Sequence, residues 1–216
     1  MPEKSNFYVN SYFKILKNRG VKSLFDEIKD NLIFDLINGT STQIREGIST
    51  KDYKHYSPAY SSLIIESIMS LNINYRDYNF IDLGSGKGKV TLIASRFRFK
   101  KILGIEIIKS LVQQAKKNQK IYFKKKWNRK YKCKIDYICS DAEKYLINSE
   151  KNIYFMFDPF PDEKLKKILK KITKKKMFKN YLIAFNPPKI LKKNTKLKLT
   201  KTIFRNTYSG MIFDIK

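Results

Sequence analysis

The chain has few of the residues from which metal sites and disulfides are built. Its 216 residues include a single histidine, His55, and only two cysteines, Cys133 and Cys139. The cysteines flank one predicted strand, and about 3.3 Å per residue puts them about 20 Å apart, far beyond disulfide reach. With one histidine and no Cys-x-x-Cys pair, the usual zinc ligands cannot be assembled. We therefore predict no metal site and no disulfide, and we interpret both cysteines as core thiols.

Long apolar runs and secretion signals are also lacking. No uninterrupted run approaches the roughly 18 apolar residues of a membrane-spanning helix, and residues 1–6 show no basic-then-apolar signal pattern. We therefore expect a cytoplasmic protein without a membrane span. A hydrophobic content of 42% and an aromatic content of 14% are typical of a folded globular chain.

Acidic residues are scarce: 19 Asp and Glu stand against 46 Lys and Arg, giving a formal net charge of +27. Such an imbalance favours a polyanionic partner such as nucleic acid. The densest block, Lys116–Lys134, interleaves basic residues with Tyr122, Phe123, Trp127 and Tyr131, a combination that suits single-stranded RNA. The alternative is a solvated surface that reflects codon usage, because lysine greatly outnumbers arginine, the better phosphate ligand.

Glycine is uncommon as well, and three of the eight glycines fall in one loop. An apolar strand containing Asp82 is followed by the segment 84–88, Gly-Ser-Gly-Lys-Gly, and then by a predicted helix. Such a loop lets backbone approach a ligand closely. A P-loop is excluded, because Leu83 stands where its first glycine belongs. The dinucleotide fingerprint is missed by one residue, at Lys89, so an NAD-dependent oxidoreductase stays as an alternative.

A second acid, Glu106, ends the next predicted strand. It lies about 20 residues beyond the loop, the spacing at which a carboxylate binds the two hydroxyls of an unphosphorylated ribose. Asp158-Pro159-Phe160 follows a later apolar strand, at the edge where open α/β sheets bind ligands.

Strands and helices alternate along the chain, which predicts a parallel sheet with helices on both faces. We expect strands at 79–83, 101–106, 134–139, 152–157 and 180–186, and a terminal hairpin at 197–204 and 208–215. Helices are expected at 7–17 and 21–37, from Pro58 through Ile68, and from Pro161. In the 21–37 helix, one apolar stripe comprises Leu24, Ile28, Leu32 and Leu36. The Pro161 helix should bury Leu165, Ile168, Leu169 and Ile172 and expose Lys164, Lys167, Lys171 and Lys174.

In this order, the motifs resemble those of the class I S-adenosylmethionine-dependent methyltransferases over residues 79–186. FIDLGSGKGKV looks like the first motif of that family, ILGIEI like the second and ICSDAEKY like the segment that contacts adenine. YFMFDPFP looks like its Asp-Pro-Pro-Tyr/Phe segment, with Phe160 in place of the second proline. Among subfamilies, the chain resembles uncharacterised bacterial members with DLGSGKG, DPFP and a late Asn-Pro.

The resemblance implies a Rossmann-like, doubly wound, mostly parallel α/β sheet with an N-terminal helical extension and a C-terminal β-hairpin. We expect the extension and a lid loop over 1–57 and the methyltransferase domain over 58–216. The residues expected to bind S-adenosylmethionine are Asp82, Gly84, Ser85, Gly86, Lys87, Gly88, Glu106, Ile107, Asp141 and Ala142. The expected catalytic residues are Asp158, Pro159 and Phe160, and Tyr56 and Tyr60 are expected to form a lid.

The resemblance thus predicts methyl transfer to a nitrogen or oxygen of an acceptor that the sequence does not identify. The candidates are RNA, protein, a sugar or a small metabolite. Two alternatives stay open, a non-catalytic RNA-binding module that uses the basic surface and the oxidoreductase. The sequence gives no oligomeric state.

Overall fold

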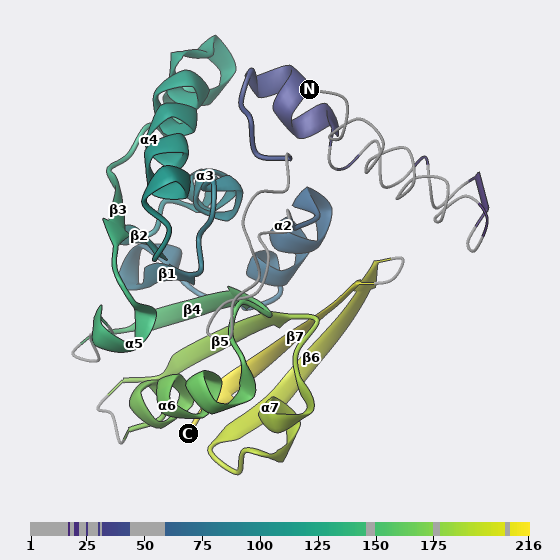
Figure 1. The fold of residues 1–216 in the computed structure, drawn as a ribbon, viewed down its shortest axis with the longest axis vertical. Coiled ribbons are helices and arrows are strands. Elements are labelled where there is room, and N and C mark those ends of the chain that lie inside the picture. The colour runs from purple at the N-terminus through teal and green to yellow at the C-terminus, as the bar shows by residue number, and fades with distance from the viewer. Residues whose placement is uncertain are drawn as a thin grey trace.

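The computed structural model describes residues 32–43, 59–145, 150–174, 178–205 and 208–216, together with the single positions 17, 20, 21, 25 and 30. A seven-stranded sheet forms the centre of these residues, in the order β3-β2-β1-β4-β5-β7-β6 (Figure 1). The first five strands of the sequence are parallel, β7 runs antiparallel to β5, and β6 runs antiparallel to β7.

The strands are β1 Asn79–Leu83, β2 Lys101–Glu106, β3 Ile135–Cys139, β4 Asn152–Phe157, β5 Asn180–Phe185, β6 Leu197–Arg205 and β7 Tyr208–Ile215. The α-helices are α2 Ser61–Met69, α3 Lys89–Ala94, α4 Lys109–Lys124, α5 Ala142–Tyr145, α6 Asp162–Ile172 and α7 Lys189–Lys193. Short 3₁₀ helices are η1 Tyr75–Asp77, η2 Ser95–Phe97 and η3 Lys126–Tyr131.

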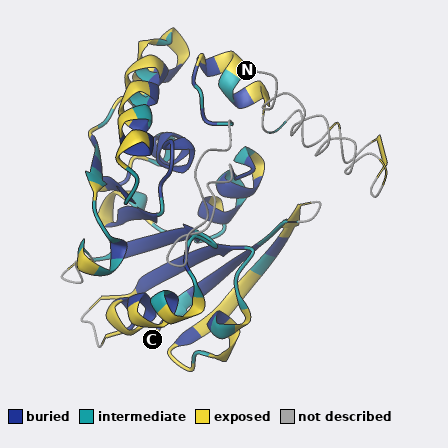
Figure 2. Ribbon diagram, viewed as in Figure 1, coloured by how far each residue is buried: buried dark blue, intermediate teal, exposed yellow. Residues whose placement is uncertain are grey.

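The central strands are short apolar runs because helices cover both faces of the sheet. Every residue of β1 and β5 is buried (Figure 2). Successive side chains alternate between two cores, so Ile183 packs on the side of α2, α3 and α4, and Leu182 packs on the side of α6 and α7. This is the doubly wound arrangement that the sequence predicted.

The sheet order creates a switch point beside β1. β1 pairs with β2 on one side and with β4 on the other, so the chain leaves β1 in one direction and returns to its opposite edge. The loops after these strands diverge there, at the carboxyl ends of the strands, and sheets of this kind bind their ligands at such a point. The glycine loop, Glu106 and the turn at Asp158 all belong to this edge.

Most predicted elements are confirmed. β1, β2 and β4 have the predicted limits, and β3 and β5 are each one residue shorter than predicted. The hairpin and the buried stripe of α6 are also confirmed. One prediction for α6 is wrong: Lys164 is not on a solvated face, because its Nζ lies 2.8 Å from Asp141 Oδ2 and most of its side chain is covered.

The apolar stripe predicted near the N-terminus is only partly described, because Leu24 and Ile28 lie outside the described residues. Leu36 is 78% exposed and Leu32 is also exposed. The described residues of this helix that are buried are instead Phe34 and Asn38, and Phe34 joins the core on the side of α4. The spacing correctly indicated a helix at 32–38 but gave the wrong face, since only contacts from distant elements decide which side of a helix is covered.

The prediction of two core thiols is wrong for Cys139 and partly right for Cys133, which packs against the edge of the core. Cys133 is half-buried just before β3, and Cys139, the last residue of β3, is exposed. Both are free thiols. β3 forms the edge of the sheet, which explains the exposure of Cys139. In the described part of the chain, no helix has the length and apolar character needed to cross a membrane.

Candidate functional site

The glycine loop is held in place by backbone hydrogen bonds to the end of β2. The N–H groups of Gly84 and Ser85 both donate to the carbonyl of Ile105, at 2.9 and 3.0 Å. The N–H of Gly86 donates to Glu106 Oε2 at 3.0 Å. The glycine loop, which was predicted to approach the ligand, is therefore hydrogen-bonded to Glu106, the acid predicted to bind the ribose.

Two of the glycines are required by close contacts as well as by their backbone angles. Gly84 has φ +82°, and a Cβ there would lie 2.8 Å from the Cβ of Pro159. Gly88 has φ +84°, and a Cβ there would lie 2.5 Å from the hydroxyl of Tyr137. Any side chain would add overlap to the strain of a left-handed backbone. The first contact brings the loop after β1 against the turn after β4.

Glu106 is buried and anchored at both carboxylate oxygens. Oε1 accepts from the N–H of Ile108 at 2.9 Å, while Oε2 accepts from Gly86. Burial raises the pKa of Glu106, and its backbone hydrogen bonds oppose that shift. A carboxylate has about four acceptor positions, so lone pairs remain for two ribose hydroxyls. The geometry fits the predicted role.

Asp82 and Ser85 each leave a buried oxygen unpaired. Among the described residues, Asp82 Oδ2 and Ser85 Oγ are buried without a hydrogen-bond partner. Burial, with the nearby charge of Glu106 second, raises the pKa of Asp82 well above its usual range. Two buried acids side by side would be stabilised by a cationic ligand. S-adenosylmethionine carries an ammonium and a sulfonium group, so these residues fit it.

Sequence reasoning missed Tyr137 and Asn118, which contact the glycine loop from β3 and α4. The hydroxyl of Tyr137 lies 2.6 Å from Thr91 Oγ1 in α3, directly beneath Gly88. Asn118 in α4 is fully buried, and its Nδ2 donates to the carbonyls of Lys87 and Ser41, at 3.0 and 3.2 Å. Asn118 thus joins the N-terminal segment to the glycine loop. No local motif could have shown these contacts.

The turn after β4 places the predicted catalytic residues at the same edge. Asp158 is half-buried and has a left-handed backbone, with φ 39°. Pro159 packs against the glycine loop at Gly84. The ring of Phe160 points into the core on the α6 side, where Leu165 also lies. Asp158 and Pro159 therefore lie at the same end of the sheet as the glycine loop. The roles of Asp158, Pro159 and Phe160 in acceptor binding stay predictions.

Asp141, which follows β3, caps α5. Its Oδ1 accepts from the N–H of Glu143 at 2.9 Å, and its Oδ2 pairs with Lys164. Ala142 is buried next to it, and Ile107 follows Glu106 at the end of β2. Contact of Asp141, Ala142 and Ile107 with an adenine ring stays a prediction, as do the roles of Ser85 and Lys87.

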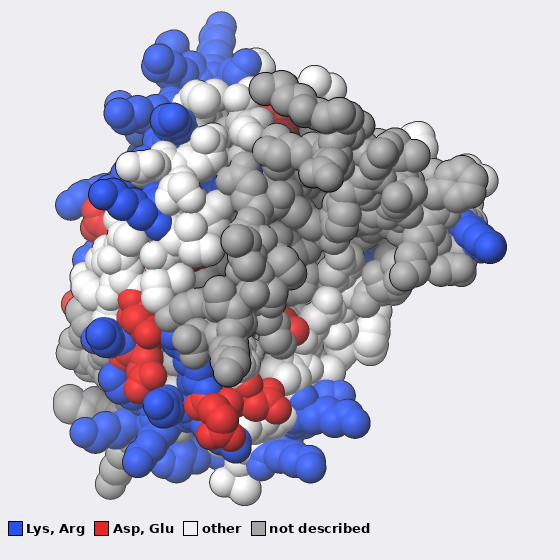
Figure 3. Space-filling view, in the orientation of Figure 1, with Lys and Arg blue, Asp and Glu red and all other residues white. Residues whose placement is uncertain are grey.

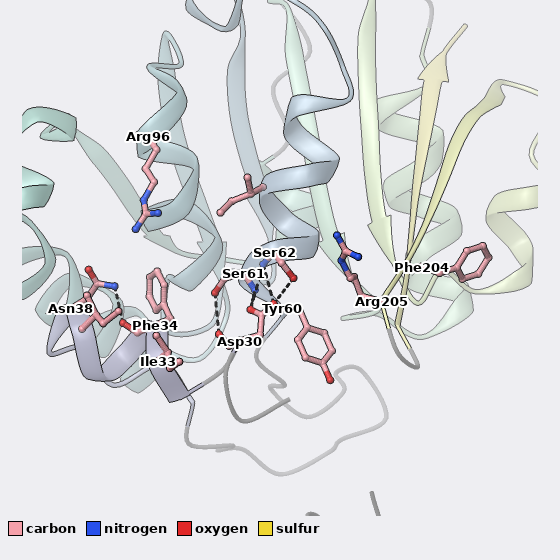
Figure 4. A pocket seen from close by; sticks show the side chains of 12 residues that line it. Asp30, Ile33, Phe34, Asn38, Tyr60, Ser61, Ser62, Arg96, Phe204 and Arg205 are labelled. Carbon is pink, nitrogen blue, oxygen red and sulfur yellow. Dashed lines mark hydrogen bonds between the residues drawn. The ribbon is translucent and has the colours of Figure 1, made fainter. Parts of the chain in front are cut away.

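The lid prediction is only partly described. Tyr56 and His55 lie outside the described residues. Tyr60 is buried and packs edge-on against Tyr208, with ring centroids 4.7 Å apart. It also borders a cavity of about 630 Å³ between the N-terminal segment and α2 (Figure 4).

The polar groups that line this cavity are largely committed to the protein. The carboxylate of Asp30 accepts from the backbone N–H groups of Ser61 and Ser62. Arg205 pairs with Glu66 at 2.7 Å, and Arg96 on the opposite side donates to Tyr122. We assign no ligand to this cavity.

Lys and Arg side chains gather over the end of α4 and η3 and again around α6 and α7 (Figure 3). Within the block 116–134, Trp127 is 51% exposed, and Lys125 Nζ lies 5.7 Å from the centre of its ring. Tyr122 is completely buried in the core and accepts a hydrogen bond from Arg96. The structure therefore contradicts an RNA-stacking role for Tyr122 and leaves Trp127 as the exposed aromatic residue beside these lysines. Among the residues described, no group of three or more His, Cys, Asp or Glu side chains could hold a metal ion.

Comparison with known proteins gives a family and a fold. The model of the family described as "Histone methylation protein DOT1" matches residues 46–179, which is more than half of the chain. No curated protein matches the sequence.

Three solved structures illustrate the fold. An RNA methyltransferase from Salinibacter ruber, in complex with S-adenosyl-L-homocysteine, is 17% identical with a TM-score of 0.54, covering 73% of this chain and 93% of its own. A SAM-dependent methyltransferase from Aquifex aeolicus is 16% identical with a TM-score of 0.51, covering 70% of this chain and 89% of its own. A precorrin 8w decarboxylase from Methanobacterium thermoautotrophicum is 16% identical with a TM-score of 0.55, covering 73% of this chain and 92% of its own. At these identities the likeness concerns the fold alone.

Proposed function

This chain belongs to the family of the histone methylation protein DOT1, and from that premise we propose how this end of its sheet performs S-adenosylmethionine-dependent methyl transfer. The cofactor would occupy the edge formed by Asp82, the glycine loop and Glu106. A nitrogen or oxygen acceptor would enter at Asp158. The observation that carries the proposal is the contact of Gly84 with Pro159, which joins the cofactor loop to the acceptor turn.

Each residue has a defined task in this scheme. The N–H groups of Gly86 and Ile108 hold the Glu106 carboxylate so that its free lone pairs face two ribose hydroxyls. Asp82 supplies a buried acceptor for a cationic group. When bound, S-adenosylmethionine supplies an activated methyl group on a sulfonium centre.

The protein needs little covalent chemistry for the transfer itself. Asp158 would accept a hydrogen bond from the acceptor nitrogen or oxygen, and it would take up the proton that this atom loses when the methyl group passes to it and the bond from the sulfonium sulfur to the methyl carbon breaks. The Gly84–Pro159 contact would hold the turn at Asp158 at a fixed distance from the loop that binds the cofactor, and positioning of this kind can supply most of the acceleration.

An RNA acceptor is a second candidate, supported by the net charge of +27 and by the exposed Trp127 beside Lys125. A strongly positive surface attracts a polyanion and repels a basic protein such as a histone tail. A protein acceptor, which the family description suggests, is therefore the less favoured alternative.

Calorimetry with S-adenosylmethionine, S-adenosylhomocysteine and NAD tests the proposal. We expect the first two to bind and NAD to give no heat. Transfer of tritium from labelled cofactor into fractionated cell extract would then identify the acceptor. A folded protein that binds neither sulfur ligand would overturn the proposal and leave the non-catalytic module, whereas binding of NAD alone would restore the oxidoreductase.

A further inference from the structure

A second polar residue, Asn186, lies beside Asp158 at the carboxyl ends of β4 and β5, which we call the acceptor edge because we place the methyl acceptor there. β4 and β5 are parallel neighbours in which Phe157 is paired with Phe185. Asp158 and Asn186, the next residue of each strand, therefore leave the sheet side by side, at a strand spacing of about 4.8 Å. Asn186 has no role in the cofactor site described above.

The two residues share an unusual backbone. Asp158 has φ 39° and Asn186 has φ 45°, and each precedes a proline. A residue before proline is normally extended, so a left-handed conformation there is strained. Strain of this kind persists where the surrounding structure enforces it, and it clusters at functional sites. The same left-handed backbone before a proline therefore occurs twice, at neighbouring positions of the acceptor edge.

The orientation of the Asn186 side chain is fixed by β7. The backbone N–H of Asn186 donates to the carbonyl of Ser209 at 2.8 Å, and Asn186 Oδ1 accepts from the N–H of Ser209 at 3.2 Å. The opposite amide orientation would set an NH₂ group against that N–H, so oxygen and nitrogen are assigned by chemistry. Within the described residues, Nδ2 makes no hydrogen bond. Asn186 is half-buried, which leaves these two donors for a ligand.

We propose that Asn186 is a specificity-determining residue that, with Asp158, reads the edge of a nucleobase as the methyl acceptor. This inference rests on the proposed function. Asp158 accepts a hydrogen bond and Asn186 Nδ2 donates one, so the pair matches a planar group with a donor and an acceptor next to each other. The nucleobases that carry an amino or imide N–H beside a ring nitrogen or carbonyl oxygen have such an edge. A lysine ammonium has donors only and would leave Asn186 Nδ2 unmatched.

The neighbouring side chains suit a flat ring. Tyr208 lies one residue before Ser209, and its ring centroid is 5.5 Å from that of Phe157 and 4.7 Å from that of Tyr60. Phe157 immediately precedes Asp158. Tyr60 is buried, so the half-buried rings of Phe157 and Tyr208 are the ones next to the polar pair, and bases extruded from a strand are commonly held against aromatic rings. The positive charge of the molecule favours the polyanion that would carry the base.

The test replaces the donor by an acceptor of the same shape. Asn186→Asp keeps an oxygen for the Ser209 N–H and tolerates the left-handed backbone, but it turns the Nδ2 donor into a second acceptor. The matched control is Asn72→Asp, because Asn72 is an exposed asparagine with φ 47° outside the site. Probes are the four single-stranded RNA homopolymers, a mixed-sequence single-stranded DNA and a lysine-rich peptide, each with tritiated S-adenosylmethionine.

We expect the wild type to methylate one homopolymer preferentially and Asn186→Asp to lose about 10- to 100-fold in kcat/KM on it, the effect of a lost or repulsive hydrogen bond. The cofactor Kd should be unchanged, and the preference among homopolymers should shrink. Asn72→Asp should match the wild type. If Asn186→Asp does not fold, Asn186→Gly, which relieves the backbone strain and removes the donor, should show the same loss of preference.

The outcomes separate this inference from the proposed function. A protein that does not bind S-adenosylmethionine refutes the proposed function itself. A protein that binds it but methylates the peptide and no nucleic acid refutes the nucleobase inference alone. Cofactor binding without transfer to any of these probes also counts against it. An Asn186→Asp variant with unchanged rate and preference would show that Asn186 does not read the acceptor.

Discussion

Glu106 holds the glycine loop through its hydrogen bonds and, in the proposed function, binds the ribose, so its replacement should disturb both. Glu106→Ala removes the acceptor for the N–H groups of Gly86 and Ile108 and leaves two ribose hydroxyls unmatched. Each lost hydrogen bond to a charged group is worth about 1.5–3 kcal/mol. We expect the Kd for S-adenosylmethionine, measured by calorimetry, to rise about 10- to 100-fold. Asp136→Ala is the control, because Asp136 makes only surface ion pairs with lysines; equal affinity losses in both variants would contradict the ribose assignment.

Asp82 should make the free protein less stable at neutral and higher pH. Burial first, and Glu106 second, raise the pKa of this carboxyl in the folded state. Its stability contribution therefore falls as pH rises from the unfolded pKa of about 3.9 towards the folded value. Asp82→Asn should unfold at higher urea than the wild type at pH 8 and converge with it near pH 4. A difference in stability that does not change with pH would show that Asp82 is not the titrating group. The same variant should bind S-adenosylmethionine about tenfold more weakly, since a charged acceptor is lost.

Asp158 should affect turnover more than cofactor binding. Asp158→Asn keeps the shape and the left-handed backbone but cannot take a proton. We expect kcat to fall about 100-fold or more, the range of general base catalysis, with little change in the cofactor Kd. Asp162→Asn is the neighbouring control, because Asp162 is an exposed residue in the first turn of α6. Comparable losses of cofactor binding and turnover would instead make Asp158 a structural or cofactor residue.

At the scale of elements, Gly88 should be less replaceable than another glycine with the same backbone. Gly88→Ala adds the overlap with Tyr137 to the strain of φ +84°. Gly20 has φ +78°, and no atom of the described residues lies within 4 Å of a Cβ built there, so Gly20→Ala is the comparison for the backbone strain. We expect urea unfolding to show a loss of about 1 kcal/mol for Gly20→Ala and about 2–4 kcal/mol for Gly88→Ala, where overpacking is added. Equal losses would mean that Tyr137 moves aside without penalty.

The strands were predictable because their signals are local. Apolar runs buried on both faces end at an acid, a glycine or Asp-Pro, and these mark β1, β2 and β4 without reference to the rest of the chain. Asp82, the glycine loop and Glu106 were found for the same reason, since their spacing is set within one β-α-β unit.

The features missed by the sequence depend on contacts between distant elements. Tyr137 lies under the glycine loop because β3 pairs with β2, and Asn186 reaches the acceptor edge because β5 pairs with β4. Tyr122 could not be separated from Trp127 by composition, although one is buried and the other exposed. The exposure of Cys139 follows from the position of β3 at the sheet edge. Sheet order and register decided the positions of Tyr137, Asn186 and Cys139, whereas Tyr122 and Trp127 differ because α4 packs on the core and η3 lies beyond its end.

For the whole molecule, the remaining question is whether the excess positive charge has a function. A net charge of +27 alone would give weak, salt-sensitive binding to any polyanion. Binding that also uses base stacking should depend on an exposed ring beside the lysines. Trp127 meets that description, with Lys125 Nζ 5.7 Å from the centre of its ring.

We therefore expect Trp127→Ala to weaken binding of a mixed-sequence single-stranded RNA 20-mer by about 5- to 100-fold, since stacking on one aromatic ring is worth about 1–3 kcal/mol. Phe204→Ala is the control, because Phe204 is an exposed aromatic residue on β6, away from η3. Fluorescence anisotropy at two salt concentrations separates the electrostatic contribution to binding from the stacking contribution. Both variants should keep the salt dependence of the wild type, because its slope reflects the number of neutralised phosphates. Only Trp127→Ala should change the affinity. If the two variants bind alike at both salt concentrations, the block 116–134 is a solvated face, and the charge then acts only as a non-specific attraction that brings an acceptor strand to the acceptor edge.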